Sequence, residues 1–201
     1  MKKTLHLLAS WLLLTAIPVL AANIAPEALV KSTVDEVMIV IKKNKDKQVL
    51  HQLAEQKVLP HFDFKRMTQL AVGKAWREAN PKQQQALENA FRTLLVNTYT
   101  SALTQSAAGA GATINVMPAR PQSGRDEVMV KTVVKESGKQ PLAIDYRMES
   151  TPAGWKVYDV IVEDVSLVMN YREEFASEIR RSGVDGLIKV LEQKNRAPAK
   201  T

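Results

Sequence analysis

The period of the hydrophobic pattern changes twice along the chain. Between residues 26 and 107, apolar side chains recur every three or four positions, as on one face of an α-helix. Between residues 113 and 162 they alternate with polar side chains, which is typical of half-buried β-strands. From residue 166 the helical spacing returns. This order predicts an α+β fold with N-terminal helices, a four-stranded antiparallel meander and C-terminal helices that cover the apolar face of the sheet.

Polar residues mark where the N-terminal helices begin. Pro26 suits a first helical position, and Asp46 and Asp63 each precede a new run of helical spacing. Asn80 is followed by Pro81 and, three positions after the asparagine, by Gln83, which is a capping-box pattern. The chain after Asn80 is therefore predicted to form a long helix that reaches residue 103.

The remaining boundaries follow from turn residues. The Gly/Ala/Ser stretch 106–112 predicts a flexible connection before a first strand around residues 114–116. Turn signals at 137–139 and 151–154 separate strands predicted at 128–135, 142–149 and 155–162. Ser166 is expected to cap a helix that Gly183 stops, and Asp185 is expected to cap a last helix ending at Glu192. The polar tail from residue 195 is expected to fray.

The first 21 residues have the layout of a secretory signal peptide. Lys2 and Lys3 precede an apolar run from Leu5 to Ile17, and Val19 and Ala21 place small residues before the expected cleavage site. The run is shorter than the ~20 residues that cross a membrane. We therefore expect residues 22–201 to form one periplasmic domain.

Composition excludes several kinds of chemistry. The chain contains no cysteine, which excludes disulfides, thiolate metal ligands and a cysteine nucleophile. The net charge of +7 falls to +5 without Lys2 and Lys3, and the basic residues are scattered. Nucleic-acid readers concentrate their basic residues with aromatic ones, so this pattern argues against nucleic acid as a partner.

Catalytic and metal-binding motifs are absent or weak. The chain has no GxSxG, GxxxxGK[ST], HExxH or GxGxxG pattern. His61 and Asp63 are close in sequence, but Asp63 already serves as a helix cap and His61 follows a proline in an expected loop. Glu163 and Asp164 lie at an expected strand end, where neighbouring side chains point to opposite faces and do not easily share a site. No metal site or cofactor is therefore expected.

Two segments resemble the MlaC family of periplasmic phospholipid carriers, which is also called the toluene-tolerance auxiliary family. The more specific segment runs from Trp155 to Arg172 and keeps its spacing to Phe175 and to the stretch 183–188. The other segment comprises residues 58–60, 70–77 and 83–99. The resemblance covers about residues 26 to 194. Asp164 departs from it, because the family commonly has glycine at this position.

The resemblance implies a soluble, non-enzymatic carrier with an apolar cavity between the sheet and the helices. Such a carrier shuttles phospholipid between an outer-membrane lipoprotein–porin complex and an inner-membrane ABC transporter with its MCE-type subunit, which maintains outer-membrane lipid asymmetry. Tyr171 and Arg172 are candidates for contact with the head group. The candidate pocket walls are Leu95, Tyr99, Leu103, Val128, Val130, Ile144, Tyr146, Met148, Val160, Val162 and Val168.

Two other functions remain open from the residues alone. One is a small α+β pocket enzyme in which His61 and Asp63 perform acid–base chemistry. The other is a periplasmic adaptor or chaperone that offers an apolar groove or a sheet edge to an unfolded protein. A large elongated apolar cavity favours the carrier, and a small cavity that contains His61 favours the enzyme. An exposed groove with no closed cavity favours the adaptor or chaperone.

We predict that the exported protein begins at Ala22, because small residues precede that position and the apolar run ends five residues before it, at Ile17. Intact-mass measurement of the protein from the periplasmic fraction checks this expectation. A product that retains residues 1–21, or that fractionates only with membranes, contradicts it.

Overall fold

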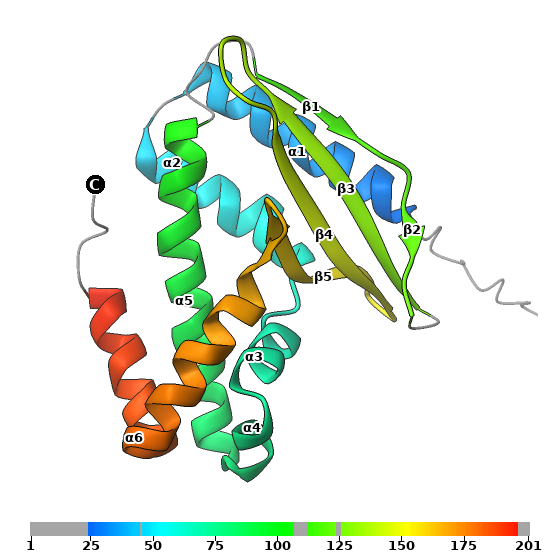
Figure 1. Ribbon diagram of the computed structural model, residues 1–201. Helices are drawn as coiled ribbons and strands as arrows, with labels where there is room; N and C mark the ends of the chain where they lie inside the picture. The colour runs from blue at the N-terminus through cyan, green and yellow to red at the C-terminus, as the bar shows by residue number, and fades with distance from the viewer. Residues whose placement is uncertain (1–23, 45, 107–111, 124–125, 197–201) are drawn as a thin grey trace, which may run out of the picture.

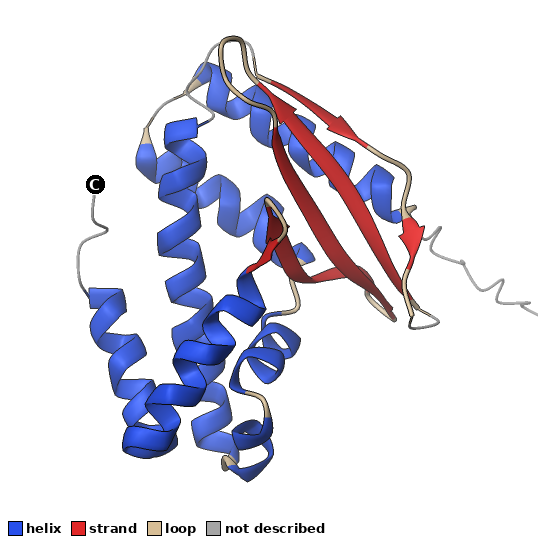
Figure 2. Cartoon of the chain, viewed as in Figure 1, coloured by secondary structure: helices blue, strands red, loops and turns tan. Residues whose placement is uncertain are grey.

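The chain forms a helical bundle beside a twisted antiparallel sheet (Figures 1 and 2). The computed structural model describes residues 24–44, 46–106, 112–123 and 126–196, except for the side chains of residue 47 and residues 99–106. The helical elements are α1 (Pro26–Lys43), α2 (Lys47–Leu53), the π-helical turn η1 (Ala54–Val58), the 3-10 turn η2 (Leu59–His61), α3 (Phe64–Val72), α4 (Lys74–Glu78), α5 (Pro81–Ser106) and α6 (Leu167–Arg196). The strands are β1 (Thr113–Val116), β2 (Arg120–Pro121), β3 (Glu127–Lys135), β4 (Leu142–Thr151), β5 (Gly154–Val162) and β6 (Val165–Ser166).

The predicted N-caps of the first helices are confirmed. Asp46 accepts a hydrogen bond from the Gln48 amide, and Asp63 accepts one from the Arg66 amide. At the start of α5, Asn80 Oδ1 accepts the Gln83 amide at 3.0 Å, and Gln83 Oε1 accepts the Asn80 amide at 3.0 Å. This reciprocal pair satisfies two amides that a helix start otherwise leaves without partners.

The predicted meander is confirmed, with two short additional strands. The sheet order is β1-β3-β4-β5-β6, and β2 also pairs with β3. Each of β2 and β6 has only two residues, which is too short to produce a detectable alternation. Between β4 and β5 the register shifts at Arg147 and Met148, which is a β-bulge.

One face of the sheet is apolar, and its members are fixed by the register. Val130 pairs with Tyr146, and Tyr146 pairs with Val160. One step along, Ile144 pairs with Val162. Partners opposite one another in an antiparallel sheet project to the same side. We call this side the inner face. Val30 of α1 packs on it against Val130 and Met148.

The hydrophobic core consists of two clusters. The helical cluster lies between α3, α4, α5 and α6 and includes Phe91, Phe175 and Leu187. The sheet cluster lies between α1 and the inner face and includes Val130 and Met148. Phe62 packs against both clusters. The sheet and the bundle therefore bury most of their apolar surface separately and meet beside Phe62.

The C-terminal helices differ from the prediction in one cap. Ser166 Oγ accepts the Met169 amide at 3.1 Å, so the predicted cap of α6 is confirmed. Gly183 has φ of 72°, a conformation that favours glycine, and it ends the first helical segment as predicted, although helix resumes after a kink. Asp185 is not the predicted cap, because helix resumes directly after the kink and the Asp185 carboxylate instead accepts a hydrogen bond from Gln83. The helix also continues past Glu192 to Arg196.

Three predictions lie outside the described residues: the signal peptide at 1–21, most of the connection at 106–112, and the end of the tail that begins at 195. Within the part of the chain that the structure does describe, no helix combines the length and the hydrophobicity needed to cross a membrane.

We predict that Asn80→Ala lowers the free energy of unfolding by about 1 kcal/mol, because it leaves the first amides of α5 without a side-chain acceptor. Urea denaturation at neutral pH measures the difference. Lys82→Ala is the control, since Lys82 is an exposed residue of the same helical turn. Equal effects of the two substitutions contradict a capping role for Asn80.

Candidate functional site

The predicted wall residues on the strands all lie on the inner face, but they differ in exposure. Val130 and Met148 are fully buried beneath α1. Ile144 and Val162, which pair with each other, are partly exposed. The remaining partly exposed members are Val128, Tyr146 and Val160. The inner face therefore includes apolar surface that the sheet cluster does not fully cover.

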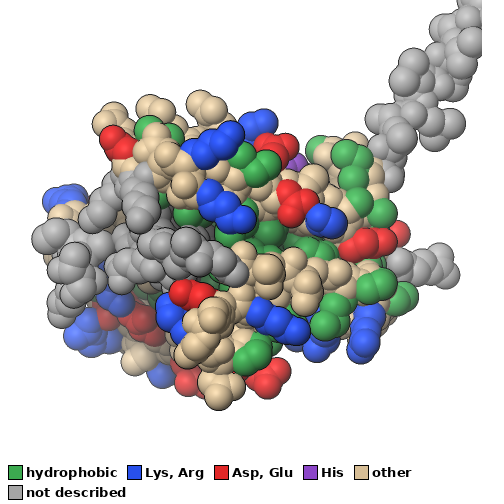
Figure 3. Space-filling model, turned by 90° about the horizontal axis from the view of Figure 1, so that it is seen from above, with side chains coloured by type: hydrophobic (Ala, Val, Ile, Leu, Met, Phe, Trp, Pro, Cys, Tyr) green, Lys and Arg blue, Asp and Glu red, His purple; other side chains and the backbone are tan. Residues whose placement is uncertain are grey.

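Seen from above, the surface of the molecule has a region where apolar side chains gather. Hydrophobic side chains occupy a hollow middle band with charged side chains on both sides (Figure 3). Burial raises the pKa of Tyr146 above its ordinary value of 10.0, which indicates a low-polarity environment around this side chain. The Thr132 hydroxyl is satisfied within the sheet, since it donates to the Ile144 carbonyl at 2.7 Å.

The predicted walls from the helices lie in the other cluster. Leu95 of α5 and Val168 of α6 both belong to the helical cluster and are buried. The side chains of Tyr99 and Leu103 lie outside the described part of the chain, although both residues belong to α5. The predicted wall set is thus divided between the two clusters, and its contact with a ligand stays a prediction.

Tyr171 and Arg172 have protein partners in the bundle. The Tyr171 ring meets Phe91 edge-to-face at 5.1 Å and lies 5.5 Å from Phe175. Arg172 donates to the Leu70 carbonyl at 3.2 Å, and its guanidinium lies against Gly73. Both side chains therefore contribute to packing of the helices, while their contact with a lipid head group stays a prediction.

Two open hollows lie on the described part of the surface, and neither is lined by a predicted wall residue. The outer hollow, about 240 Å³, lies on the polar face of the sheet and is lined by Met117, Lys131, Thr132, Val133, Ala143, Asp145, Ile161, Glu163 and Asp164. The hairpin hollow, about 330 Å³, is lined by Phe62, Asp63, Phe64, Lys65, Glu88, Thr151 and Lys156. Both volumes are at or below the lower end for pockets that bind drug-sized molecules.

The expectation that Glu163 and Asp164 do not share a site is wrong. They form the turn between β5 and β6, with φ of 46° and 65°, and both line the outer hollow. Opposite projection applies to extended strand residues and not to a tight turn. The positive φ of Asp164 also explains why a glycine suits this position.

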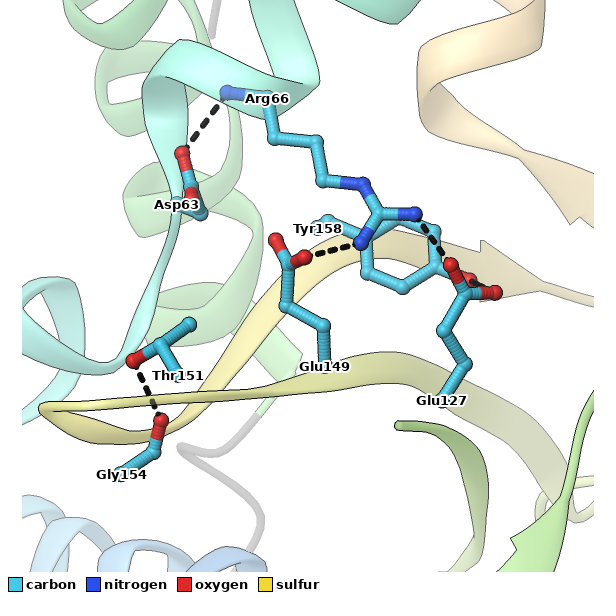
Figure 4. A network of polar contacts seen from close by, with 7 residues as sticks. All are labelled: Asp63, Arg66, Glu127, Glu149, Thr151, Gly154 and Tyr158. Carbon is cyan, nitrogen blue, oxygen red and sulfur yellow. Dashed lines mark hydrogen bonds and ion pairs between the residues drawn. The ribbon is translucent and has the colours of Figure 1, made fainter. Parts of the chain in front are cut away.

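A charged network, which sequence reasoning missed, fixes α3 to the sheet (Figure 4). The Arg66 guanidinium donates to Glu127 of β3 and to Glu149 of β4, and it stacks 3.7 Å from the centre of the Tyr158 ring. The Tyr158 hydroxyl donates to the other Glu127 oxygen at 3.0 Å. Glu127 and Glu149 are paired residues in the sheet, but they lie 61 and 83 positions from Arg66, so no local spacing could have revealed the network.

The structure does not join His61 and Asp63 into a catalytic pair. Asp63 caps α3 with its carboxylate, and its amide donates to the Val157 carbonyl. His61 is half-buried in η2 and not in an exposed loop, and burial together with the charge of Lys156 lowers its pKa. Among the described residues, no three His, Asp or Glu side chains are grouped so that they could hold a metal ion.

The fold and the inner face define an α+β protein in which an antiparallel sheet and a helical bundle bury separate hydrophobic clusters. Residues 31–193 match the family model described as MlaC protein. The chain belongs to the MlaC family.

Individual relatives agree with the family match. Toluene tolerance protein ttg2D of Pseudomonas putida is 28% identical over 86% of this chain and 82% of its own length. The intermembrane phospholipid transport system binding protein MlaC of Haemophilus influenzae is 21% identical over 88% of this chain and 85% of its own. A solved phospholipid-binding protein from Ralstonia solanacearum, in complex with a phospholipid, is 38% identical with a TM-score of 0.75, covering 85% of this chain and 97% of its own.

We predict that Arg66→Met lowers the free energy of unfolding by about 1–3 kcal/mol at pH 7, because it leaves two partly buried carboxylates without their donor. The hydrogen bond from Arg66 lowers the pKa of Glu127 below its ordinary value of 4.5. A lowered carboxyl pKa stabilises the folded state above pH 4.5, and that contribution is lost as the pH falls. The difference between wild type and variant should therefore shrink between pH 7 and pH 3.

Urea denaturation at several pH values checks this dependence. Arg77→Met is the matched control, because Arg77 is an exposed arginine on the neighbouring helix α4. A loss of stability that does not change with pH would show that Arg66 acts through packing of its methylene groups and not through its charge.

Proposed function

We propose that this chain is a periplasmic phospholipid-binding transport protein. The observation that carries the proposal is the match of fold and sequence to the phospholipid complex from Ralstonia solanacearum, which covers nearly the whole of that chain. The two curated relatives support the same class, since one is named as a phospholipid transport binding protein and the other as a toluene tolerance protein.

The physical task explains why a protein is required. Transfer of one methylene group from an apolar environment to water costs ~0.8 kcal/mol. Two acyl chains of sixteen carbons therefore place a phospholipid on the order of 20 kcal/mol uphill in water. An apolar protein surface that replaces the bilayer interior removes most of this cost. Transfer of this kind breaks no covalent bond, so it requires no catalytic group.

We assign the acyl chains to the space between the two hydrophobic clusters. The partly exposed inner face provides one wall, with Ile144, Tyr146, Val160 and Val162. The helical cluster provides the facing wall, with Leu95 and Val168. Neither hollow is lined by these wall residues, so we expect the two clusters to separate when the acyl chains enter.

The carrier is further proposed to exchange its cargo with two membrane complexes. These are an outer-membrane lipoprotein–porin complex and an inner-membrane ABC transporter with an MCE-type subunit, and exchange between them maintains outer-membrane lipid asymmetry. The signal peptide expected at residues 1–21 agrees with a periplasmic site of action.

The decisive experiment measures lipid bound to the protein after expression in the periplasm. We expect phospholipid to be recovered by solvent extraction and identified by mass spectrometry at about one molecule per protein. Ile144→Asp should reduce the bound lipid more than tenfold while the protein remains folded. A carboxylate beside a hydrocarbon chain must admit water or take up a proton, and either course costs several kcal/mol.

Thr113→Asp is the matched control, because it places the same charge on an exposed position of β1. Circular dichroism and thermal melting monitor the fold of both variants. A folded Ile144→Asp protein that retains its lipid contradicts the proposed wall. Wild-type protein that carries no phospholipid contradicts the proposed function itself.

A further inference from the structure

The hairpin hollow lies where the bundle meets the end of the β4–β5 hairpin. Its lining comes from three regions that are distant in sequence: the segment 62–65, Glu88 of α5, and Thr151 and Lys156 of the hairpin. Its volume of about 330 Å³ is sufficient for a small polar group. Sequence reasoning did not identify it, because no local pattern brings these three regions together.

Phe62 connects this hollow to both hydrophobic clusters. Its ring lines the hollow and packs against both the helical and the sheet cluster. The backbone beside it is fixed, because Phe62 forms a parallel bridge with Val157 of β5. Phe64 stacks on Phe62 at 5.8 Å between ring centres. Phe62 is therefore a side chain that the hollow shares with both clusters.

The charged groups of the hollow are two ammonium groups and two carboxylates. The Asp63 carboxylate caps α3, and the Lys156 ammonium donates one hydrogen bond to the Pro60 carbonyl. Lys65 and Glu88 have no ion-pair or hydrogen-bond partner for their side chains among the described residues, although they line the same hollow. Lys65 and Glu88 thus line one hollow without an ion pair between them.

We infer that the hairpin hollow binds the zwitterionic head group of a phospholipid, with the phosphate beside Lys65 and Lys156 and the ammonium group beside Glu88. This inference rests on the proposed function. Four lining charges of opposite sign give the hollow no net formal charge, which matches a head group that also has none. An anionic head group such as phosphatidylglycerol supplies no cation for Glu88 and adds unbalanced negative charge.

The test loads delipidated protein from vesicles that contain equal amounts of phosphatidylethanolamine and phosphatidylglycerol. Bound lipid is extracted, and the ratio of the two species is measured by mass spectrometry. Glu88→Lys should lower the ratio of phosphatidylethanolamine to phosphatidylglycerol about two- to fivefold, the size expected for one partly exposed charge pair. Lys65→Glu should reduce total loading and shift the ratio in the opposite direction, because it adds repulsion towards the anionic lipid.

Matched controls carry the same charge changes on exposed positions of α6, as Glu173→Lys and Lys189→Glu. The inference is overturned if Glu88→Lys and Glu173→Lys give the same lipid ratio. That outcome differs from failure of the proposed function, in which wild-type protein binds neither lipid. Thermal melting of each variant confirms that the comparison is made between folded proteins.

Soluble glycerophosphoethanolamine, which has the head group and no acyl chains, separates a lipid site from a site for a free metabolite. We expect its excess to leave the lipid ratio of wild-type protein unchanged, because the chains supply most of the binding free energy. The assignment to lipid would be overturned if the soluble compound bound tightly to wild-type protein, if Glu88→Lys abolished that binding, and if the same substitution left the lipid ratio unchanged.

Discussion

The sheet and the bundle each bury a hydrophobic cluster of their own, and Phe62 packs against both. Apolar surface that is covered within one cluster does not depend on the other cluster for its stability. Separation of the clusters therefore costs the contacts along the junction and not those within each half. The proposed carrier function depends on this division, because it would let acyl chains enter at the junction without unfolding either half.

Polar contacts fix the orientation of the helical bundle relative to the sheet at the junction between the two hydrophobic clusters. Arg66 binds Glu127 and Glu149 of two adjacent strands, while the Tyr158 ring covers its guanidinium. At the start of α6, buried Asp159 of β5 accepts hydrogen bonds from the Ser166 hydroxyl and from the Val168 amide, so the sheet also orients this helix. Charge-assisted hydrogen bonds are directional, so both contacts fix orientation as well as distance.

Much of the fold could be predicted because its signals are local. The caps at Asp46, Asp63 and Asn80 depend on hydrogen bonds that span two or three residues. The four longer strands were evident from alternation that the covered inner face imposes on each of them. The prediction missed the two-residue strands because they are too short to show an alternation. It was wrong for Asp185 because this side chain accepts a hydrogen bond from Gln83, a residue distant in sequence, and does not cap a helix.

The sequence by itself determined the order of helices and strands, the helix starts, the apolar side of the sheet and the resemblance to the MlaC family, because each of these is written in spacing along one segment. Tertiary structure alone decided that the apolar residues divide into two clusters, that Tyr171 packs against Phe91, and that Lys65 and Glu88 line one hollow. These arrangements join residues that are tens of positions apart. Which of these residues come into contact depends on how the helices and strands pack together, and the hydrophobic spacing within a single element carries no information about that packing.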